Sequence, residues 1–401
     1  MIVGARSVTF PGLPCPWFLP HPLAGDPLEG SIRAFPFVVT LITIGAGSVG
    51  PARAQSALDV HLLGFADVNY LETDRGVDDG FFLGQLVGHA AAGLSERTTF
   101  FTEVSATARP DEYRIEVERL ILRYDFSDAL KVSAGRYHTP INYWNTAYHH
   151  GLWLQTTVSR PEMIRFGTRF QPVHFVGVQV EGAFPATPLG VGYAAGLGNG
   201  RSEDIARGGD PGDVNNHRAW LGQLYVRPPS LFGFQAGGGF YIDRISPEQE
   251  ELLGLPSDVD ERIVSAHVAW LRESPEFIGE YAHVFHELRD GGEEHDSDAW
   301  YAQLAYRLPG RAGDWKPYAR YERLELPTAD PVYEPFDLEY EGATAGVRFD
   351  FTSLAALKVE YRRERFETPD WFDSLYFQVS LAFGETGGQD APIIPETDHQ
   401  P

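Results

Sequence analysis

The chain has 401 residues, a formal net charge of −24 and an aromatic content of 13%. The negative charge argues against binding of nucleic acid or anionic lipid, and a slightly negative mean hydropathy excludes a bundle of membrane-spanning helices. The only cysteine, Cys15, lies near the N-terminus, so the rest of the chain has neither a disulfide framework nor a cysteine nucleophile or metal ligand.

Residues 1–54 are predicted to be a leader that carries a secretion signal. An apolar run of 15 residues, 35–49, follows Arg33 and precedes the cleavage-site pattern Ala52-Arg53-Ala54. The run is shorter than the roughly 20 residues that a spanning helix needs. The cleavage pattern behind it disfavours the alternative of an internal core strand. The Pro-rich residues 1–30 lie upstream of any normal signal, so we expect the true start somewhere before Arg33.

Residues 55–383 are predicted to form one transmembrane antiparallel β-barrel. Segments of roughly ten residues alternate between apolar and polar positions, which is the length and the period of strands that cross a membrane. In 299–308, Trp300 and Leu304 share one face and Gln303 lies on the other. A soluble β-sandwich also alternates, but its strands are shorter. Here aromatic residues recur near the strand ends, as in the interfacial girdles of membrane barrels.

The connections between these segments alternate between short and long, as periplasmic turns and extracellular loops do. Long connections are predicted at 71–80, 108–113, 139–171, 200–217, 243–260, 287–297, 325–337 and 366–372. Eight loops and seven turns join about 16 strands, and both ends of the barrel then lie on the same side. A further strand at 162–170 would place the later long loops on the periplasmic side. We therefore assign residues 162–170 to the preceding loop. Eighteen strands is the nearest alternative.

The last predicted strand ends at Phe383 and is apolar at every second position. Its apolar face consists of Leu375, Phe377, Val379, Leu381 and Phe383. It resembles the C-terminal signal that the barrel-assembly machinery recognises, which makes that machinery an expected partner. Outer-membrane proteins usually end at this aromatic residue, whereas this chain continues for 18 residues, 384–401. The Gly-, Pro- and acid-rich composition of that segment predicts a disordered periplasmic tail.

Loop 139–171 differs from the other long loops in length and composition. It contains Arg160, Arg165 and Arg169 against the single acid Glu162, whereas the other outer loops are rich in acids. A basic, aromatic segment is poorly suited to an exposed loop of an acidic protein, so we expect it to fold into the lumen and narrow a pore. Rings of arginine select anions, which predicts a mild anion preference. The predicted constriction residues are Tyr143, Trp144, His149, His150, Arg160, Arg165 and Arg169.

The same region resembles a known family. Its short motifs are, in order, Ala134-Gly135-Arg136-Tyr137, Thr139-Pro140, Tyr143-Trp144-Asn145, His149-His150-Gly151 and Arg160-Pro161. This series is similar to bacterial porins related to the phosphate-selective porin family. The resemblance implies a passive channel for small hydrophilic solutes or ions, narrowed by its third outer loop. It also implies a homotrimer among the lipids of a Gram-negative outer membrane. Phosphate selectivity does not carry over, because the loop has no dense lysine cluster.

Seven bases are predicted to face the lumen from the strands. They are Arg119, Arg123, Lys316, Arg320, Arg348, Lys358 and Arg362, and they alternate with acids such as Asp125, Glu322, Asp350, Glu360 and Glu364. One interpretation is a wet wall of mutually paired charges that holds the barrel open. The other is a basic ladder that guides anions past the loop.

No metal site or cofactor is predicted. His149 and His150 are adjacent, and in an extended segment their side chains point to opposite sides. One metal ion therefore needs ligands from elsewhere, such as His138 or His174, and hydrogen bonding within a packed loop is the favoured interpretation. The acidic outer loops can bind surface Ca²⁺ through carboxylates, but their spacing matches no dedicated calcium loop.

No catalytic set is predicted, and we expect no enzyme. The chain has no G-x-S-x-G, no H-E-x-x-H and no phosphate-binding loop. Ser265 and His267 share one face of one strand, and nothing in the sequence marks them as activated. A barrel hydrolase that uses this pair and a structural or adhesive barrel with a closed lumen are the two alternatives to a porin.

Overall fold

The structure is a computed structural model that describes residues 60–75, 79–109, 112–327, 329–336, 338–366 and 370–385. The predicted leader and the tail from residue 386 onward lie outside the described residues. The described part contains sixteen strands. They are β1 (Val60–Thr73), β2 (Gly80–Ser95), β3 (Thr98–Ala108), β4 (Tyr113–Ser127), β5 (Leu130–His138), β6 (His174–Phe184), β7 (Val191–Asn199), β8 (Arg218–Val226), β9 (Phe234–Ile245), β10 (Val259–Leu271), β11 (Glu276–Leu288), β12 (Glu294–Ala305), β13 (Trp315–Glu325), β14 (Tyr340–Thr352), β15 (Ala355–Phe366) and β16 (Phe372–Glu385).

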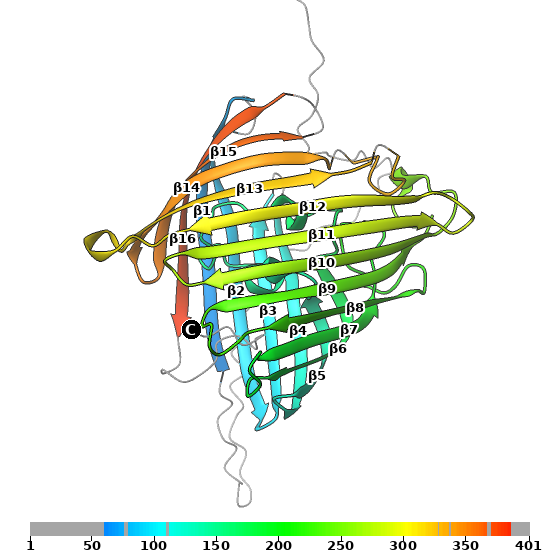
Figure 1. Ribbon diagram of the computed structural model, residues 1–401, viewed down its shortest axis with the longest axis horizontal. Coiled ribbons are helices and arrows are strands. Elements are labelled where there is room, and N and C mark those ends of the chain that lie inside the picture. The colour runs from blue at the N-terminus through cyan, green and yellow to red at the C-terminus, as the bar shows by residue number, and fades with distance from the viewer. Residues whose placement is uncertain are drawn as a thin grey trace, which may run out of the picture. The chain divides into compact units, whose positions relative to one another are not determined.

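The strands form one closed antiparallel barrel, which confirms the predicted fold class and the count of sixteen (Figure 1). Each strand pairs with its neighbours in sequence, and β1 pairs with β16 to close the ring. Closure removes every free sheet edge, so all strands can pair their backbone groups without water. Among the described residues, no helix is long and apolar enough to cross a membrane.

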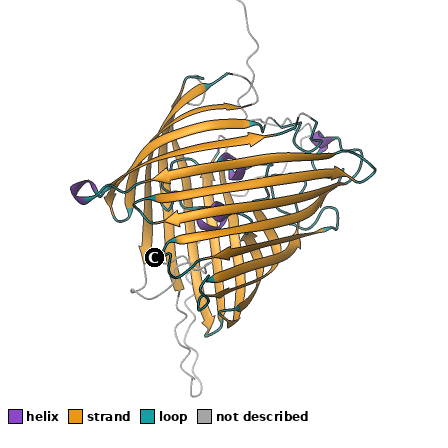
Figure 2. Cartoon of the chain, in the orientation of Figure 1, coloured by secondary structure: helices purple, strands orange, loops and turns teal. Residues whose placement is uncertain are grey.

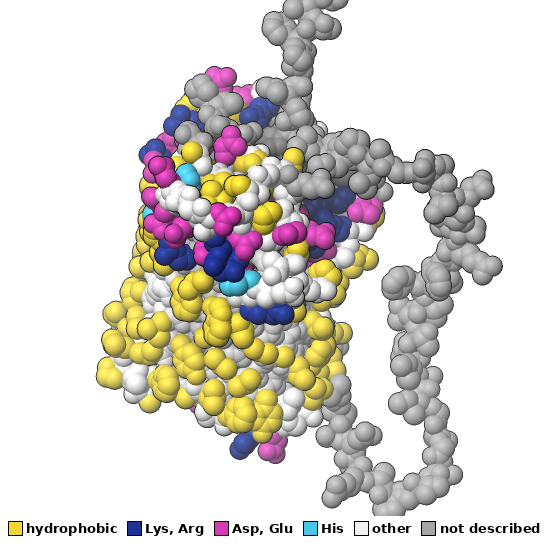
Figure 3. Space-filling model, turned by 90° about the vertical axis from the view of Figure 1, so that its right-hand side faces the viewer, with side chains coloured by type: hydrophobic (Ala, Val, Ile, Leu, Met, Phe, Trp, Pro, Cys, Tyr) yellow, Lys and Arg dark blue, Asp and Glu magenta, His cyan; other side chains and the backbone are white. Residues whose placement is uncertain are grey.

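The two faces of the strands differ in polarity. On β12, Trp300 and Leu304 point outward and are 36% and 54% exposed, whereas Tyr301 and Gln303 point inward and are buried. Figure 3 shows the result on the face in view, where hydrophobic side chains form a band over the strands and charged side chains gather beyond it. An apolar outer band is the surface that a barrel presents to lipid.

The last strand runs slightly further than predicted. Gly384 and Glu385 continue β16 past Phe383 and pair with Leu63 and Leu62 of β1. The prediction that the strand ends at Phe383 is therefore wrong by two residues, because pairing with β1 continues beyond the aromatic position. Phe383 lies opposite Gly64, and a Cβ added to this glycine would be 2.4 Å from the Phe383 ring.

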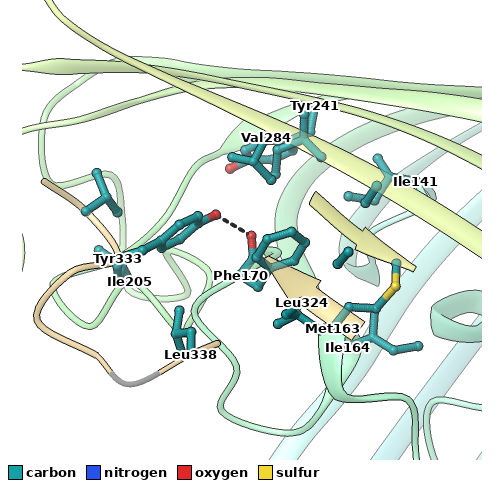
Figure 4. Packing of buried hydrophobic residues seen from close by; sticks show 14 of the residues in the cluster. Ile141, Met163, Ile164, Phe170, Ile205, Tyr241, Val284, Leu324, Tyr333 and Leu338 are labelled. Atoms are coloured by element: carbon teal, nitrogen blue, oxygen red, sulfur yellow. Dashed lines mark hydrogen bonds between the residues drawn. The ribbon is translucent and has the colours of Figure 1, made fainter. Parts of the chain in front are cut away.

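The largest apolar core lies inside the barrel, and loops build much of it. Met163, Ile164 and Phe170 come from the connection between β5 and β6, and Ile205 and Tyr333 come from two other loops. The hydroxyl of Tyr333 donates a hydrogen bond of 2.7 Å to the carbonyl oxygen of Phe170 (Figure 4). The inward-facing residues of β9–β14 cover this cluster from the wall. The short helices α1 (Tyr143–Ala147) and η1 (Glu162–Ile164) lie in the same region (Figure 2).

The contact between Gly64 and Phe383 predicts a stability effect at the seam of the barrel. Gly64→Val forces the Phe383 ring, which is 45% exposed, away from the β1–β16 pair, and loss of this cross-strand contact costs about 0.2–1 kcal/mol. We expect a lower urea midpoint for the barrel folded in detergent, followed by tryptophan fluorescence. Gly88→Val is the matched control, because Gly88 pairs with Gly64 on β2 and has no atom within 4 Å of an added Cβ. Equal midpoints for the two variants would contradict this account of the seam.

Candidate functional site

The connection between β5 and β6, residues 139–173, folds back inside the barrel, and we call it the infolded loop. Apart from Gly167, each of its residues is buried or half-buried. Ile141, Tyr143 and Trp144 are at most 2% exposed. Apolar and aromatic side chains of this size gain free energy when they leave water, and the lumen is where the loop can bury them.

Helix α1 of the infolded loop is held by the wall opposite β5. Asn142 at its N-cap position makes no side-chain capping bond. Instead, the backbone N–H of Trp144 donates to Glu280 of β11 over 3.0 Å, and the hydroxyl of Tyr301 donates to the other oxygen of this carboxylate over 2.9 Å. A carboxylate at a helix N-terminus satisfies backbone donors that the helix leaves unpaired.

Glu360 of β15 holds the next part of the loop. Its carboxylate accepts hydrogen bonds from the backbone N–H groups of Val158, over 2.8 Å, and Ser159, over 3.2 Å. The hydroxyls of Ser159 and Tyr318 donate to the same group over 2.5 and 2.9 Å. Four donors thus meet on one carboxylate that is fully buried. This contact fixes the loop against a strand far around the ring from β5 and β6.

Three of the predicted lumen bases bind the carbonyl groups of the infolded loop. Lys358 donates to the carbonyls of Leu152 and Thr157. Arg348 donates to those of Trp153 and Gln155, and Arg320 to those of Ser159 and Arg160. The three bases are at most 8% exposed. They face inward, but the loop covers them, so they do not form a ladder along an open wall.

The remaining predicted bases are paired with acids. Arg119 contacts Glu103, Arg123 contacts Asp125 and Glu181, Lys316 contacts Glu276, and Arg362 contacts Glu364. Arg320 and Arg348 also pair with Glu322 and Asp350 on their own strands. These contacts favour the interpretation of a wall of mutually paired charges.

The arginines of the loop are also engaged. Arg160 lies 3.8 Å over the ring of Phe166 and donates to the carbonyl of His149 over 2.8 Å. Arg165 pairs with Glu162. Arg169 pairs with Glu250 over 2.8 Å.

The aromatic residues predicted for the constriction pack against the wall. Trp144 meets Tyr301 edge to face, with ring centroids 6.0 Å apart. The ring of Tyr143 lies 5.9 Å from that of His267. Both residues are thus anchors of the loop in the packed core.

A second buried network joins the other loops to this core, and sequence reasoning missed it. Arg201, from the connection between β7 and β8, pairs with Glu261 of β10, and both side chains are fully buried. Arg201 also donates to the carbonyl of Phe170. His286 lies between Glu261 and Asp330, 3.2 and 2.9 Å from their oxygens. These residues come from separate segments, and no local pattern in the sequence links them.

Ser265 and His267 do not form a nucleophile and base. The hydroxyl of Ser265 donates to the carbonyl of Ile141 in the infolded loop. The Nε2 atom of His267 lies 2.8 Å from the side-chain amide of Gln235. No hydrogen bond between Ser265 and His267 is present in the described part of the chain, and the serine serves to hold the loop.

Among known proteins, the chain is similar in fold to several solved structures. No protein-family model matches the chain, and no curated protein matches its sequence. Among solved structures, the anion-selective porin from Comamonas acidovorans matches with a TM-score of 0.59 and 11% identity, over 81% of this chain and 100% of that one. OmpF of Salmonella typhi, in complex with daunomycin, matches with a TM-score of 0.57 and 12% identity, over 81% of this chain and 97% of that one.

The outer membrane channel DcaP of Acinetobacter baumannii also matches, with a TM-score of 0.54 and 12% identity, over 84% of this chain and 100% of that one. At such low identity these similarities show the fold alone. The chain therefore has the barrel architecture found in outer-membrane porins.

The role of Glu360 as an anchor can be tested by hydrogen exchange. Glu360→Gln places an amide donor where the loop presents its own donors. Leaving a buried donor unpaired costs about 1–3 kcal/mol. We therefore expect exchange in residues 156–160 to accelerate roughly fivefold to hundredfold.

Glu364→Gln is the control for this test. Glu364 is similarly buried on the same strand, but it contacts Tyr340 and Arg362 instead of the loop. Unchanged exchange in the Glu360→Gln variant would show that the carboxylate does not anchor the loop.

Proposed function

We propose that the protein is a porin of a Gram-negative outer membrane, through which small hydrophilic solutes diffuse passively. The observation that carries the proposal is the infolded loop, which crosses the lumen and is bound by Ser265 of β10 and by charged side chains of β11 and β13–β15. A barrel of sixteen strands is wide enough for an aqueous channel, and a loop inside it sets how much of that width solutes can use.

The outer surface of the barrel supports a location in a membrane. Figure 3 shows an apolar band on the outside of the strands in view, and outward residues such as Phe81 of β2 and Ile115 of β4 are 83% and 67% exposed. Exposed aromatic and aliphatic residues in such number fit contact with lipid. The solved structures that share the fold include proteins described as porins and channels. One related structure, OmpT of Vibrio cholerae, is described in a trimer form, and we extend a homotrimer to this chain as part of the proposal.

We expect the ion selectivity of the channel to be weak. The arginine excess of the loop predicts a mild anion preference, but Arg165 and Arg169 have carboxylate partners and Arg160 is buried against Phe166. Paired charges set up little net field in a pore. In a salt gradient across a planar bilayer, we expect a reversal potential close to zero. Its small displacement is expected to be toward the Nernst potential for the anion. A value near the Nernst potential for the cation would contradict this.

Replacement of the infolded loop tests the proposed function. His138 and His174 are directly paired at the ends of β5 and β6, so a two-residue Asn-Gly turn can replace residues 139–173. We expect single-channel conductance in a planar bilayer to rise severalfold. The control replaces residues 289–293, between β11 and β12, by the same turn and is expected to leave conductance unchanged.

The result also separates the rival functions. A structural or adhesive barrel, closed by packed side chains, does not conduct with its loop in place. Equal conductance of the two loop variants and the unaltered protein would contradict the constriction. A barrel hydrolase loses activity on Ser265→Ala or His267→Ala, whereas a porin still conducts.

A further inference from the structure

Four histidines meet between the infolded loop and the wall of the barrel. His138 ends β5 and His174 begins β6, and these two residues are directly paired. His149 and His150 approach them from the loop. The ring centroids of His149 lie 3.9 Å from His138 and 4.5 Å from His174. One ring nitrogen from each of the four lies within 4.8 Å of the others, and the residues are at most 9% exposed.

The adjacent pair His149-His150 points toward one place, contrary to the expectation for an extended segment. The chain bends directly after helix α1, so the two rings lie 4.6 Å apart at an angle of 75°. The prediction that this pair cannot approach one ion together is therefore wrong, because it assumed alternating side chains. His138 and His174, the partners that the sequence offered, are the ones that the fold supplies.

Hydrogen bonds leave a lone pair of His149 pointing at the cluster. The side-chain amide of Asn145 donates to the carbonyls of Thr139 and Val173, which turns its oxygen toward His149. Nδ1 of His149 lies 2.7 Å from that oxygen, which can only accept, and 3.2 Å from a nitrogen of Arg160, which can only donate. The shorter contact favours an Nδ1 that is protonated and donates to Asn145. Nε2 is then the unprotonated nitrogen, and it has no hydrogen-bond partner. A second hydrogen bond that fixes the tautomer in this way is typical of histidines that bind metal ions.

Other nitrogens of the cluster lack hydrogen-bond partners as well. Both ring nitrogens of His138 are buried without a hydrogen bond, whereas the Nε2 atoms of His150 and His174 contact the carboxylate of Glu118. Unpaired buried polar atoms are costly, at about 1–3 kcal/mol each. Several of them around one point indicate that a ligand for nitrogen lone pairs belongs there.

A β-bulge brings a carboxylate to the same point. Glu103 pairs with Arg119 and Val104 with Val117, so Glu118 is the extra residue on β4 and turns inward. Its Oε2 atom lies 3.2 Å from Nε2 of His150 and 3.3 Å from Nε2 of His174. Ligand atoms around a tetrahedral ion with bonds of about 2.0 Å are separated by roughly 3.3 Å.

Two carboxylates and three guanidinium groups surround the cluster, so an ion there is held by its ligand atoms and not by an excess of negative charge. Glu103 and Glu118 face it with two carboxylates. Arg119, Arg136 and Arg160 lie nearby, but Arg119 pairs with Glu103 and Arg136 with Glu118.

We propose that His138, His149, His150 and His174, with Glu118 beside them, bind a divalent first-row transition-metal ion. Imidazole donors suit Zn²⁺, Cu²⁺, Ni²⁺ and Co²⁺ and disfavour Mg²⁺ and Ca²⁺. The ion fastens the infolded loop to the ends of β5 and β6, on the side of the barrel away from Glu360. This inference does not depend on conduction by the barrel.

Cobalt titration of the full chain tests the site. The folded protein in detergent is stripped with a chelator and titrated with Co²⁺, whose visible absorption reports coordination. We expect saturation at one ion per chain and displacement by Zn²⁺. Absence of saturable binding at one equivalent overturns the proposal.

Variants and a structural readout complete the test. We expect His149→Gln/His150→Gln to weaken Co²⁺ binding by tenfold or more, while His283→Gln, in the half-exposed group with Asp296 and Asp298, leaves it unchanged. The reverse pattern overturns the proposal. Because the double variant can fail to fold, X-ray absorption of the Zn²⁺-loaded unaltered protein counts the imidazoles directly. Three or four support the site, and two or fewer overturn it.

Discussion

The structure depends on one constraint, which is that the polar backbone of a loop buried inside a barrel needs hydrogen-bond partners. Buried N–H and C=O groups are rarely left unpaired, and an infolded loop lacks the regular pairing of a strand. Here the wall supplies the partners. Glu280 and Glu360 accept from the loop's N–H groups, and Arg320, Arg348 and Lys358 donate to its carbonyls.

This constraint gives the charged residues of the strands a role that differs from selectivity. An ion pair or a charged hydrogen bond that is buried under the loop cannot also attract solutes, because its charge is already compensated. The same reasoning explains why an acidic chain can carry a basic loop inside it. Glu250 and Glu322, from a neighbouring loop and from β13, contact Arg169 and the backbone of Glu162. The lumen is thus shaped by polar contacts whose charges largely cancel.

Much of the fold follows from the period-two pattern of the sequence. The alternation of residues such as Trp300 and Gln303 predicts both faces of the wall, and the alternation of turns and loops predicts sixteen strands. The composition of 139–171 marks it as unusual. These predictions succeed because they rest on local periodicity, which a membrane barrel repeats along its whole length.

The finer parts of the site could not be predicted, for identifiable physical reasons. The bulge at Glu118 changes which face a residue occupies, and it depends on pairing with β3. The approach of His149 to His150 depends on the bend that follows α1. The infolded loop packs against one side of the lumen, and this side determines which basic residues of the strands contact it. Each of these is a tertiary effect that overrides a local pattern.

The central claim is that the infolded loop sets the width of a diffusion path through the barrel. Liposome swelling with sugars of increasing size measures that width most directly. For the unaltered protein, the account predicts that swelling rates fall steeply from monosaccharides to trisaccharides, and that this dependence flattens when a short turn replaces residues 139–173. Failure of monosaccharides to enter through the unaltered protein, or the same dependence on size for both proteins, would contradict it.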